Sequence, residues 1–454
     1  WTAGARVPTS GAAAVMSTTD PTGEAYRVQR SDGPVVARVV VPPSKSIVNR
    51  ALVCAALADG TSEITGVAPG DDTTAMIDCL QRLGCGIGIR LDGDHRIADV
   101  IGTAAELTPG PMRLDAGLAG TTSRFVTALC ALGDGEYTVD GAPPLRSRPM
   151  GPLHDSLTAL GATVTPGETV GCLPVTVSGP LRRADAVVMP GDVSSQYVTA
   201  LMLIAPYIPG GLKLWLSSGL VSRPYLEITR SVMSAFGVTD VDIKERHVTV
   251  GPGEYLPTEY VVEPDASSAS YPLAAAAMVG GAVSVPGLGT RSVQGDARFV
   301  EILASMGCIV TAGPTDTVVM RRRDTPLRGV DVDMADISDL VPTLAVVATQ
   351  AVTPTRISGV GFIRGKESDR LGDLAAELSK TGALVTVEPD GLLIEPTDLL
   401  HGARLGTHHD HRLAMAFGLL GLVVDGIEIG DPAVVSKSWP SYWDALAAIP
   451  SHLT

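Results

Sequence analysis

The chain has 454 residues, a formal net charge of −15 at pH 7 and a sequence pI of about 4.9. Its 45% hydrophobic and 18% charged residues are typical of a globular protein with room for two or three domains. The acidic balance argues against nucleic-acid binding, which needs a basic face. No run of 18 apolar residues predicts a membrane span.

Residues 1–26 are small, polar and Pro-containing, and they predict a disordered leader with Met16 as the expected natural start. They lack the apolar core of a signal peptide and the Arg-rich pattern of a transit peptide. The cysteines show no C-x-x-C spacing and lie mostly in apolar segments, which favours buried, reduced thiols in the cytosol. They are Cys54, Cys79, Cys85, Cys130, Cys172 and Cys308.

An amphipathic run that ends in a turn glycine and an apolar strand recurs along the chain. It occurs at residues 76–90, 153–164, 230–241, 299–310 and 374–385. The turn glycines Gly84, Gly161, Gly237, Gly307 and Gly382 are 77, 76, 70 and 75 residues apart. A further helix at residues 442–449 falls where the next copy is due. Such a period indicates a repeated supersecondary unit.

Each copy also carries a second, more apolar helix. These helices are expected to start at Ser44, Gly120, Val193, Asp265, Ala335 and His408, and short strands such as SEITGV and IEIGD follow them. Ser, Thr and Asp at such starts can accept hydrogen bonds from free N–H groups. A helix that is apolar nearly all round belongs inside a domain. The unit therefore reads α-β-α-β-β, and six units predict an α/β (α+β) protein with two cores of three units each.

Basic and hydroxyl side chains recur at the helix starts and in the loops after the strands in most copies. Each motif alone is usually a solvated loop, but recurrence at equivalent positions favours convergence on one place. Helix N-termini attract anions, and Arg offers paired donors to carboxylate and phosphate. The sequence thus predicts a pocket for ligands with several negative charges. Copy four breaks the pattern: DASSASY has no cation cluster and is interpreted as structural, and Arg291 and Arg298 as surface charges.

The motifs together resemble one family closely. The segments PPSKSIVNRALVCAALADG, LAGTTSRF, RPMGPL, GDVSSQYVTALM, SRPY, DASSASY, GKESDRL, DHRLAMAF and SKSWPSYW occur in the order found in 3-phosphoshikimate 1-carboxyvinyltransferases, the EPSP synthase family. The resemblance covers residues 28 to 449. It implies two globular domains, each an inside-out α/β barrel of three units, with a cleft between them. The expected division is residues 44–262 as an inserted domain, and residues 27–43 plus 263–454 as a discontinuous one.

The resemblance also implies the activity. The enolpyruvyl group of phosphoenolpyruvate would pass to the 5-hydroxyl of shikimate 3-phosphate with release of phosphate, by addition and elimination through a tetrahedral intermediate. This reaction belongs to the shikimate pathway, which leads to chorismate and the aromatic amino acids, and the family is the glyphosate target. The family needs no metal or other cofactor, and it implies a cytoplasmic monomer with two small-molecule substrates, no nucleic acid and no membrane.

The resemblance assigns roles residue by residue. Catalysis would fall to Lys45, Asp339, Glu367 and Lys437, with Asp339 as the base for the hydroxyl and Glu367 exchanging the proton at the methylene carbon. Shikimate 3-phosphate would contact Lys45, Ser46, Arg50, Ser194, Ser195, Gln196, Ser222, Tyr225, Asp339 and Lys366. Phosphoenolpyruvate would contact Lys45, Gly120, Arg124, Arg148, Gln196, Arg370, Arg412 and Lys437.

Three residues depart from the pattern of many family members: Leu118 and Phe362 where Asn is frequent, and Phe125 where Pro is frequent. Two alternatives stay open. The first is the sister enzyme, UDP-N-acetylglucosamine enolpyruvyl transferase, which typically carries a Cys in the loop that here reads PPLRSRPM. The second is a non-catalytic repeat protein that binds phosphorylated ligands, which would need the cations but neither Asp339 nor Glu367.

Overall fold

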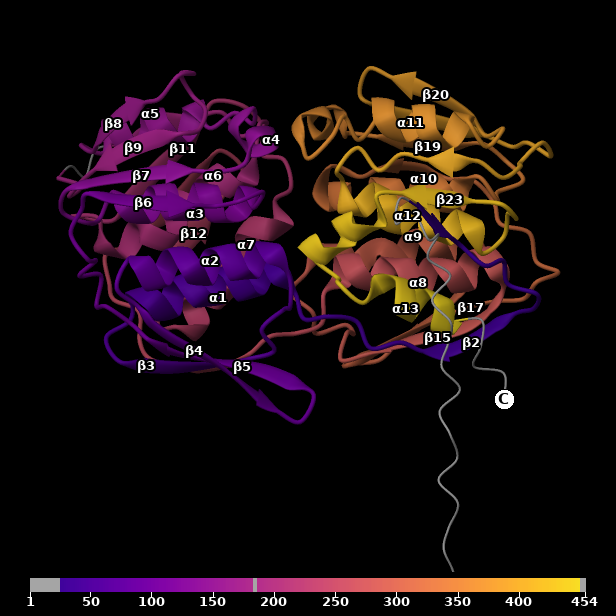
Figure 1. The fold of residues 1–454 in the computed structure, drawn as a ribbon, viewed down its shortest axis with the longest axis horizontal. Helices are drawn as coiled ribbons and strands as arrows, with labels where there is room; N and C mark the ends of the chain where they lie inside the picture. Colours follow the sequence, from indigo (N-terminus) through magenta and orange to yellow (C-terminus); the bar gives the residue numbers. More distant parts are fainter. Residues whose placement is uncertain (1–24, 183–185, 450–454) are drawn as a thin grey trace, which may run out of the picture.

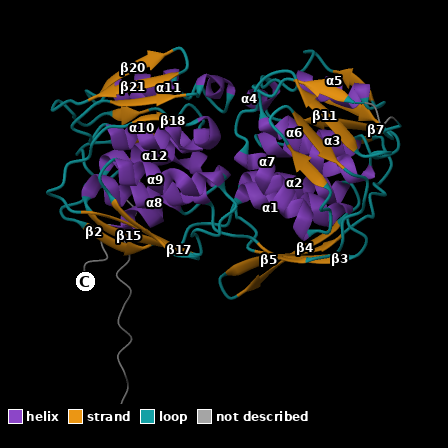
Figure 2. Cartoon of the chain, turned by 180° about the vertical axis from the view of Figure 1, so that it is seen from behind, coloured by secondary structure: helices purple, strands orange, loops and turns teal. Residues whose placement is uncertain are grey.

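In the computed structural model, which describes residues 25–182 and 186–449, the chain forms two lobes side by side (Figure 1). The first lobe holds the elements from α1 to β14, and the second lobe holds β1, β2 and the elements from α8 to α13. In both lobes the helices lie inside and the sheets form the outer walls (Figure 2). The predicted α/β fold with an inside-out arrangement is confirmed.

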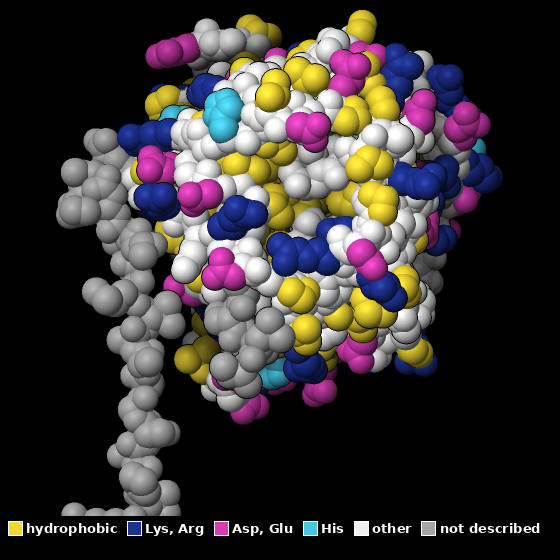
Figure 3. Space-filling view, turned by 90° about the vertical axis from the view of Figure 1, so that its right-hand side faces the viewer, with side chains coloured by type: hydrophobic (Ala, Val, Ile, Leu, Met, Phe, Trp, Pro, Cys, Tyr) yellow, Lys and Arg dark blue, Asp and Glu magenta, His cyan; other side chains and the backbone are white. Residues whose placement is uncertain are grey.

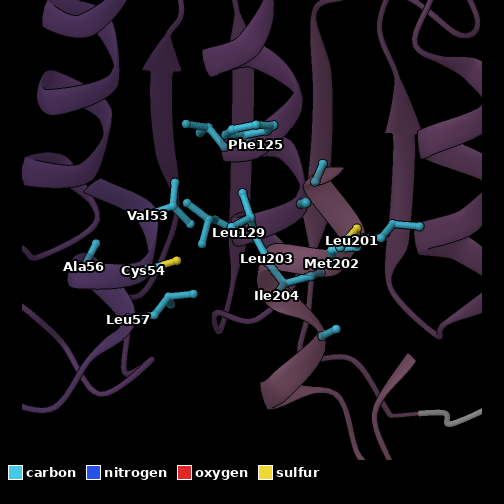
Figure 4. Packing of buried hydrophobic residues seen from close by; sticks show 14 of the residues in the cluster. Val53, Cys54, Ala56, Leu57, Phe125, Leu129, Leu201, Met202, Leu203 and Ile204 are labelled. Atoms are coloured by element: carbon cyan, nitrogen blue, oxygen red, sulfur yellow. The ribbon is translucent and has the colours of Figure 1, made fainter. Parts of the chain in front are cut away.

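The apolar helices form the centres of the lobes, as predicted. They are α1 (Lys45–Leu57), α3 (Gly120–Cys130), α6 (Ser195–Ile204), α8 (Ala266–Val279), α10 (Val341–Ala348) and α12 (His411–Gly421). Every residue of α8 is buried, and its run of alanines lets neighbouring helices approach closely on all sides. In the first lobe, α1, α3 and α6 contribute Val53, Leu129 and Ile204, among other side chains, to one hydrophobic cluster (Figure 4). Buried area of this kind is the main stabilising contribution to the fold.

Amphipathic helices cover these centres. They are α2 (Asp71–Arg82), α5 (Gly151–Ala159), α7 (Pro224–Ala235), α9 (Phe299–Ser305), α11 (Gly372–Ser379) and α13 (Tyr442–Ala448). The predicted turn glycines follow them with positive φ: Gly84 (109°), Gly161 (99°), Gly237 (92°), Gly307 (106°) and Gly382 (82°). Glycine is the residue that adopts this conformation without a steric cost. The repeat read from the sequence is therefore present in the backbone.

Among the described residues, five of the six sheets share one topology, and the sheet around β23 is a smaller variant of it. A central strand follows each apolar helix: β3 (Thr61–Thr65), β7 (Glu136–Asp140), β11 (Leu212–Leu216), β15 (Gly281–Pro286), β19 (Thr355–Ser358) and β23 (Glu428–Gly430). An antiparallel hairpin adds to the first five: β4 (Gly86–Asp92) with β5 (His95–Ile101), β8 (Thr163–Pro166) with β9 (Val175–Ser178), β12 (Val241–Ile243) with β13 (His247–Val250), β16 (Ile309–Ala312) with β17 (Asp316–Arg321), and β20 (Leu384–Glu388) with β21 (Gly391–Glu395).

The predicted unit lacked one strand, which pairs in parallel with each central strand. These strands are β14 (Glu259–Val261), β6 (Met112–Asp115), β10 (Val187–Met189), β2 (Val35–Arg38), β18 (Asp331–Asp333) and β22 (Arg404–Leu405). In the sheet around β23, the strand β1 (Ala25–Arg27) takes the place that a hairpin strand has elsewhere. The predicted leader of residues 1–26 is thus too long at its end, because Ala25 and Tyr26 lie in β1. Residues 1–24 lie outside the described part.

The chain passes twice between the lobes, and the two passages lie against each other. Pro43 and Pro264 form an isolated antiparallel bridge. The backbone N–H of Ser44 donates to the Glu263 carbonyl at 2.9 Å, and that of Asp265 donates to the Pro42 carbonyl at 2.8 Å. The two lobes therefore meet along a paired, hydrogen-bonded connection on one side of the cleft.

Short helical turns complete the connections. They are α4 (Pro143–Arg146), η1 (Ala205–Tyr207), η2 (Gly295–Arg298), η3 (Ala335–Leu340), η4 (Gly361–Gly365) and η5 (Pro432–Lys437). All six cysteines are unpaired; Cys172 is half-buried and the others are buried, close to the prediction. Among the described residues, no helix is long and apolar enough to cross a membrane.

Two helices begin later than predicted. The helix expected from Ala335 starts at Val341, after the turn η3, in which Ile337 has non-helical backbone angles. Pro342 lies in the first turn of α10, where its missing N–H has no cost. The helix expected from His408 starts at His411, because His408 and His409 have positive φ and Asp410 caps the helix. Both delays leave polar residues on irregular backbone at the cleft.

Candidate active site

A pocket lies between the lobes. Residues from both sides line it: Lys45, Ser46, Arg50, Asp72, Gly120, Thr121, Arg148, Ser195, Gln196, Ser222, Tyr225, Asp339, Lys366, Glu367, Arg370, His411 and Arg412. Most of the site residues predicted from the sequence are in this set. The helix starts therefore converge on one pocket, as predicted.

Arg50 lies beneath the pocket on α1 and is only 2% exposed. Its guanidinium donates to Thr229 Oγ1 at 2.8 Å and to the Ser46 carbonyl at 2.7 Å. Its carbon Cζ lies 5.5 Å from the centre of the Phe125 ring, a cation–π contact. Burial lowers the pKa of Arg50 to about 10. Among the described residues no carboxylate lies within ion-pair distance of Arg50, so this buried cation is left for an anion.

Arg124 and Arg148 approach the start of α3. Arg124 donates to the Gly120 carbonyl at 2.7 Å, and burial followed by the neighbouring Arg148 lowers its pKa to about 10. A Cβ placed on Gly120 would lie 2.5 Å from Nη1 of Arg124 and 2.6 Å from Nη1 of Arg148. Glycine at this position therefore lets two guanidinium groups reach the backbone at the helix start.

The starts of α6 and α7 supply hydroxyl and amide groups. Ser194 caps α6 by accepting from the backbone N–H of Gln196 at 3.3 Å, and Ser195 lines the pocket. The Gln196 amide donates to Thr121 Oγ1 at 3.3 Å. Ser222 has a φ of 55°, a conformation that non-glycine residues adopt at a cost of about 1–3 kcal/mol. Such strain is frequent at binding sites.

The second lobe contributes a carboxylate held between two arginines. Asp339, on η3, accepts from Arg370 Nη1 at 2.9 Å and from Arg412 Nη2 at 2.7 Å. Burial favours the neutral acid, but Arg412, Arg370 and Lys366 outweigh burial and hold the pKa of Asp339 below its usual range. Asp410, fully buried at the start of α12, accepts from Arg370 Nε at 2.7 Å and fixes that guanidinium.

Glu367 lies on the loop between η4 and α11, among cations from both lobes. Its carboxylate is 2.8 Å from Arg370, 3.2 Å from Lys437 and 3.5 Å from Arg148. Burial opposes ionisation here as well, but Lys437, Arg370 and Arg148 hold the pKa of Glu367 well below its usual range. Two ionised acids, Asp339 and Glu367, thus lie on one wall of the pocket.

Several contacts cross between the lobes. The Tyr225 hydroxyl donates to Asp339 at 3.2 Å, and the backbone N–H of Ser222 donates to the Ala335 carbonyl at 3.2 Å. Lys437 Nζ donates to the Leu118 carbonyl at 3.3 Å. These contacts, together with the Arg148–Glu367 pair, show the lobes closed upon the pocket.

The pocket keeps an excess of positive charge. Among the described residues that line it, Lys45, Arg50, Arg148, Lys366, Arg370 and Arg412 outnumber the carboxylates Asp72, Asp339 and Glu367. On the outer face of the second lobe, by contrast, basic and acidic side chains are interspersed (Figure 3). An acidic protein therefore concentrates cations in its cleft, which suits ligands with several negative charges.

Three of the predicted site residues lie just outside the lining of the pocket. Ser194, Arg124 and Lys437 do not line the pocket themselves, although each contacts a residue that does. Asp72 was missed: it accepts from Lys45 Nζ at 2.9 Å. An acidic residue in the first turn of a helix usually complements the helix dipole, so its sequence context gave no signal. His411 lines the pocket too; its motif DHRLAMAF was recognised, but only the arginine received a role.

The three unusual residues lie beside the site. Phe125 packs against Arg50, and Leu118 meets Lys437 through its carbonyl. The centre of the Phe362 ring lies 5.8 Å from Nζ of Lys366. Phe125 and Phe362 thus supply ring faces to two of the cations, where the family frequently has Pro and Asn.

Two lobes of three repeated units, with cations and two ionised acids converging between them, define an enzyme that acts on phosphorylated acids. The family model of EPSP synthase (3-phosphoshikimate 1-carboxyvinyltransferase) matches residues 30–446. The chain is 43% identical to the 3-phosphoshikimate 1-carboxyvinyltransferase of Methanosphaerula palustris over 424 residues, which cover 92% of this chain and 97% of that protein. It is 39% identical to the Methanospirillum hungatei enzyme over 421 residues, covering 92% and 96%.

Solved structures agree on the fold. The EPSP synthase of Acinetobacter baumannii superposes with a TM-score of 0.78 at 24% identity, covering 94% of this chain and 98% of that one. The chain belongs to the EPSP synthase family and is an enolpyruvyl transferase of aromatic biosynthesis. The resemblance stated from the motifs is confirmed, and the sister-enzyme and non-catalytic alternatives are set aside.

Proposed function

We propose that the cleft transfers the enolpyruvyl group of phosphoenolpyruvate to the 5-hydroxyl of shikimate 3-phosphate with the residues assigned above. The observation that carries this proposal is the pairing of Asp339 and Glu367 with the cations that would also bind the substrates. The excess positive charge of the pocket suits two ligands that each carry a carboxylate and a phosphate.

On the acceptor side, Ser46 and Arg50 hold the shikimate carboxylate. Ser194, Ser195, Ser222 and Lys366 hold the 3-phosphate, and Tyr225 lies against the ring. Three features support this placement: Arg50 has no acidic partner among the described residues, Ser195 lies in the first turn of α6, and Ser222 is buried at the lobe boundary. Free N–H groups at a helix start favour a phosphate.

On the donor side, Arg124, Arg148, Arg370, Arg412 and Lys437 bind phosphoenolpyruvate, with the backbone of Gly120 close by. Lys45 and Gln196 lie between the two substrates. In the first step Asp339 takes the proton of the 5-hydroxyl, the oxygen bonds to C2 of phosphoenolpyruvate, and Glu367 protonates C3. In the second step Glu367 takes a proton back from C3 and the C–O bond to phosphate breaks. The cations stabilise the leaving phosphate, and Asp339 gives the hydroxyl proton up to that phosphate or to solvent.

Both acids have low pKa values in the ligand-free site. The values matter for catalysis because substrate binding raises them. Substrate carboxylate and phosphate groups compete for the same arginines and lysines that hold the acids ionised. Added negative charge raises the pKa of a neighbouring acid. Substrate binding therefore makes Asp339 a stronger base and lets Glu367 carry a proton.

The assay that tests the proposal measures phosphate release with both substrates present. We expect release only when shikimate 3-phosphate and phosphoenolpyruvate are added together, and the same rate in a chelator. UDP-N-acetylglucosamine in place of shikimate 3-phosphate serves as the matched acceptor control. Two results would contradict the assignment. The first is turnover with UDP-N-acetylglucosamine as acceptor but not with shikimate 3-phosphate, and the second is phosphate release from phosphoenolpyruvate without any acceptor.

The division into residues 44–262 and residues 27–43 plus 263–454 is part of the same proposal. Two separate hydrophobic clusters support this division. One contains buried residues from Ile47 to Val262, and the other contains buried residues before and after that range, with Val28 the first and Ile449 the last. We also propose a cytoplasmic monomer: both walls of the site come from one chain, and unpaired cysteines are typical of reducing compartments. Sedimentation at assay concentration measures the assembly state, and a stable dimer would contradict it.

A further inference from the structure

The segment Gln294–Gly295–Asp296, in the copy without a cation cluster, lies at the junction of the lobes. The Gln294 amide nitrogen donates to Glu263 Oε1 at 2.9 Å and to the Pro264 carbonyl at 2.7 Å. Its amide oxygen accepts from the backbone N–H of Ala266 at 3.0 Å. Gln294 therefore ties the turn η2 to the second passage of the chain between the lobes.

Gly295 touches the opposite lobe. A Cβ on Gly295 would lie 2.5 Å from Pro224 Cβ and 2.7 Å from Pro224 Cγ, at the start of α7. Real Cβ atoms do not approach other carbon atoms so closely. The contact between Gly295 and Pro224 is therefore as tight as the two backbones allow, and it joins the two lobes.

A small cavity lies behind this contact and is built from both lobes. Ser44, Ser46, Pro224, Tyr225 and Ile228 line it from the first lobe, and Asp265, Ser267, Gln294, Gly295 and Asp296 line it from the second. Ser46 and Tyr225 also line the active-site pocket. The cavity is thus the back wall of the acceptor side, and opening of the lobes would expose it to water.

Asp296 is a buried ionisable group of the second lobe that the proposed mechanism does not use. Its side chain is 4% exposed, and its Oδ2 accepts from the Ser267 hydroxyl. Its Oδ1 has no hydrogen-bond partner, and no cation lies within ion-pair distance, among the described residues. A buried carboxylate without a cation is costly. The geometry alone therefore favours the uncharged acid.

The charged and titratable groups around Asp296 support the same conclusion. Asp265 faces it from the start of α8, Asp339 from η3, Tyr225 from α7 and Arg412 from α12. Arg412, the cation of this set, is engaged by Asp339 at 2.7 Å. Burial, then the charge of Asp339, raises the pKa of Asp296 to about 7.

We propose that Asp296 is a positioning residue of the cleft, whose uncharged carboxyl permits the lobes to close around the acceptor and whose ionisation opposes closure. The inference rests on the proposed function only in naming shikimate 3-phosphate as the acceptor. Asp296 does not touch the reacting atoms; it acts through the wall formed by Tyr225 and Ser46.

The sign of the pH effect follows from the two states. In an open cleft Asp296 meets water, and a solvated Asp has a pKa of about 4. Below this pH both states carry the proton and closure is unaffected. Between about pH 4 and about pH 7 the open state releases the proton and the closed state keeps it, so closure weakens by up to roughly tenfold per pH unit. Above this window the penalty is complete and constant.

The experiment measures the affinity for shikimate 3-phosphate by calorimetry from pH 4.5 to 8.5, in the wild type and in Asp296→Asn. Asn keeps the shape and cannot ionise. The control is Asp92→Asn, an exposed residue at the β4–β5 turn. We expect the ratio of the Asp296→Asn affinity to the wild-type affinity to rise at least tenfold between pH 5 and pH 7.5, whereas the control ratio stays constant. Titration of the substrate phosphate is common to all variants and cancels in the ratio.

A constant ratio, or weaker binding by Asp296→Asn at every pH, would show a purely structural role and overturn the proposal. If Asp296→Asn does not fold, Asp296→Ser provides a second residue that cannot ionise. If the wild type binds no shikimate 3-phosphate, the proposed function fails separately. The radius of gyration of the ligand-free protein then decides: it should increase from pH 5 to pH 8 in the wild type and stay constant in Asp296→Asn, and equal behaviour of the two would overturn the inference.

Discussion

Asp339 and Asp296 lie on one wall of the cleft, but their different surroundings give the two aspartates different pKa values. Both are largely removed from water, and burial raises the pKa of both. Of these two aspartates, Arg370 and Arg412 pair with Asp339 and not with Asp296, so Asp339 stays ionised while the pKa of Asp296 is raised to about 7. Pairs of acids whose pKa values are pushed apart divide their roles at enzyme sites. In the mechanism proposed here the ionised acid would act as the base, and the neutral one would permit closure.

Replacing the base should separate binding from chemistry. We expect Asp339→Asn to reduce kcat by roughly 100-fold or more, the usual loss for a general base, while shikimate 3-phosphate still binds. Stopped-flow turnover and calorimetric binding measure the two effects. Asp336→Asn, an exposed neighbour on η3, is the control. A near-wild-type kcat in Asp339→Asn would remove this residue from the mechanism.

The close approach at Gly120 should make it sensitive to one added methyl group. In Gly120→Ala the new Cβ meets the guanidinium groups of Arg124 and Arg148, which must move. We expect a raised KM for phosphoenolpyruvate and a larger loss of glyphosate inhibition, with kcat less affected. Gly253→Ala, whose Cβ would meet nothing within 4 Å, is the control. Unchanged KM and unchanged inhibition would mean that donor and inhibitor bind elsewhere.

At the scale of single residues, the sequence predicted the site residues that stand at helix starts, because a position at a helix start is enough to place a residue in the pocket. It could not predict Asp72 or Asp296. The first lies in an acidic helix start that reads as ordinary dipole compensation. The second follows a Gln-Gly pair whose partners, Glu263 and Pro224, are roughly 30 and 70 positions away in the printed chain. Only the folded chain brings them together.

At the scale of elements, the period of about 75 residues predicted helix types and turn glycines well. Helix ends were less predictable. Ser44 caps α1 without a side-chain hydrogen bond, whereas Ser194, Asp265 and Asp410 accept from backbone N–H groups as expected. Most of the parallel strands escaped prediction because they have only two to four residues, too few to show an alternating pattern.

The turn glycines allow a test of the repeat itself. Gly307 has a φ of 106°, and an added Cβ would meet only the Pro326 carbonyl, at 3.5 Å. In Gly307→Ala the cost is therefore mainly backbone strain, about 1–2 kcal/mol of the free energy of unfolding. Denaturant titration measures it, with Gly33→Ala as a control in open space without positive φ. An unchanged midpoint would show that this turn tolerates a side chain.

At the scale of the whole molecule, strands from segments far apart in the sequence pair with each other. β14 returns to pair with β3, with Glu259 opposite Glu63, and β2 crosses to pair with β15. Each lobe is thus closed by a strand that lies next to a passage between the lobes. The motifs implied two domains through resemblance, but pairings of this separation leave no local signal in the sequence.

The charges in the cleft include carboxylates as well as the predicted cations. Cations alone on the two faces of a cleft would repel each other. The structure places Glu367 between Arg148 of the first lobe and Arg370 and Lys437 of the second. The repulsion is therefore partly compensated, and the remaining excess of cations is what a ligand must neutralise.

Closure driven by the acceptor follows from this arrangement. Shikimate 3-phosphate would reach Ser46 and Arg50 in the first lobe and Lys366 in the second, so it favours the closed state, as a population shift requires. Phosphoenolpyruvate alone should close the lobes less. Gly295→Ala supplies a steric contrast, because its Cβ would overlap Pro224 when the lobes meet. It should hold the cleft partly open without touching any substrate.

Small-angle scattering measures this directly. We expect shikimate 3-phosphate to decrease the radius of gyration of the wild type, and high salt to reduce the difference by screening the cleft charges. Gly295→Ala should show a smaller decrease and weaker binding, whereas Gly253→Ala should behave as wild type. An identical radius with and without saturating shikimate 3-phosphate would reject closure driven by the acceptor and leave the chemistry standing. A full decrease in Gly295→Ala would instead show that the Pro224 contact yields, and that the lobes are held together by the charges of the cleft alone.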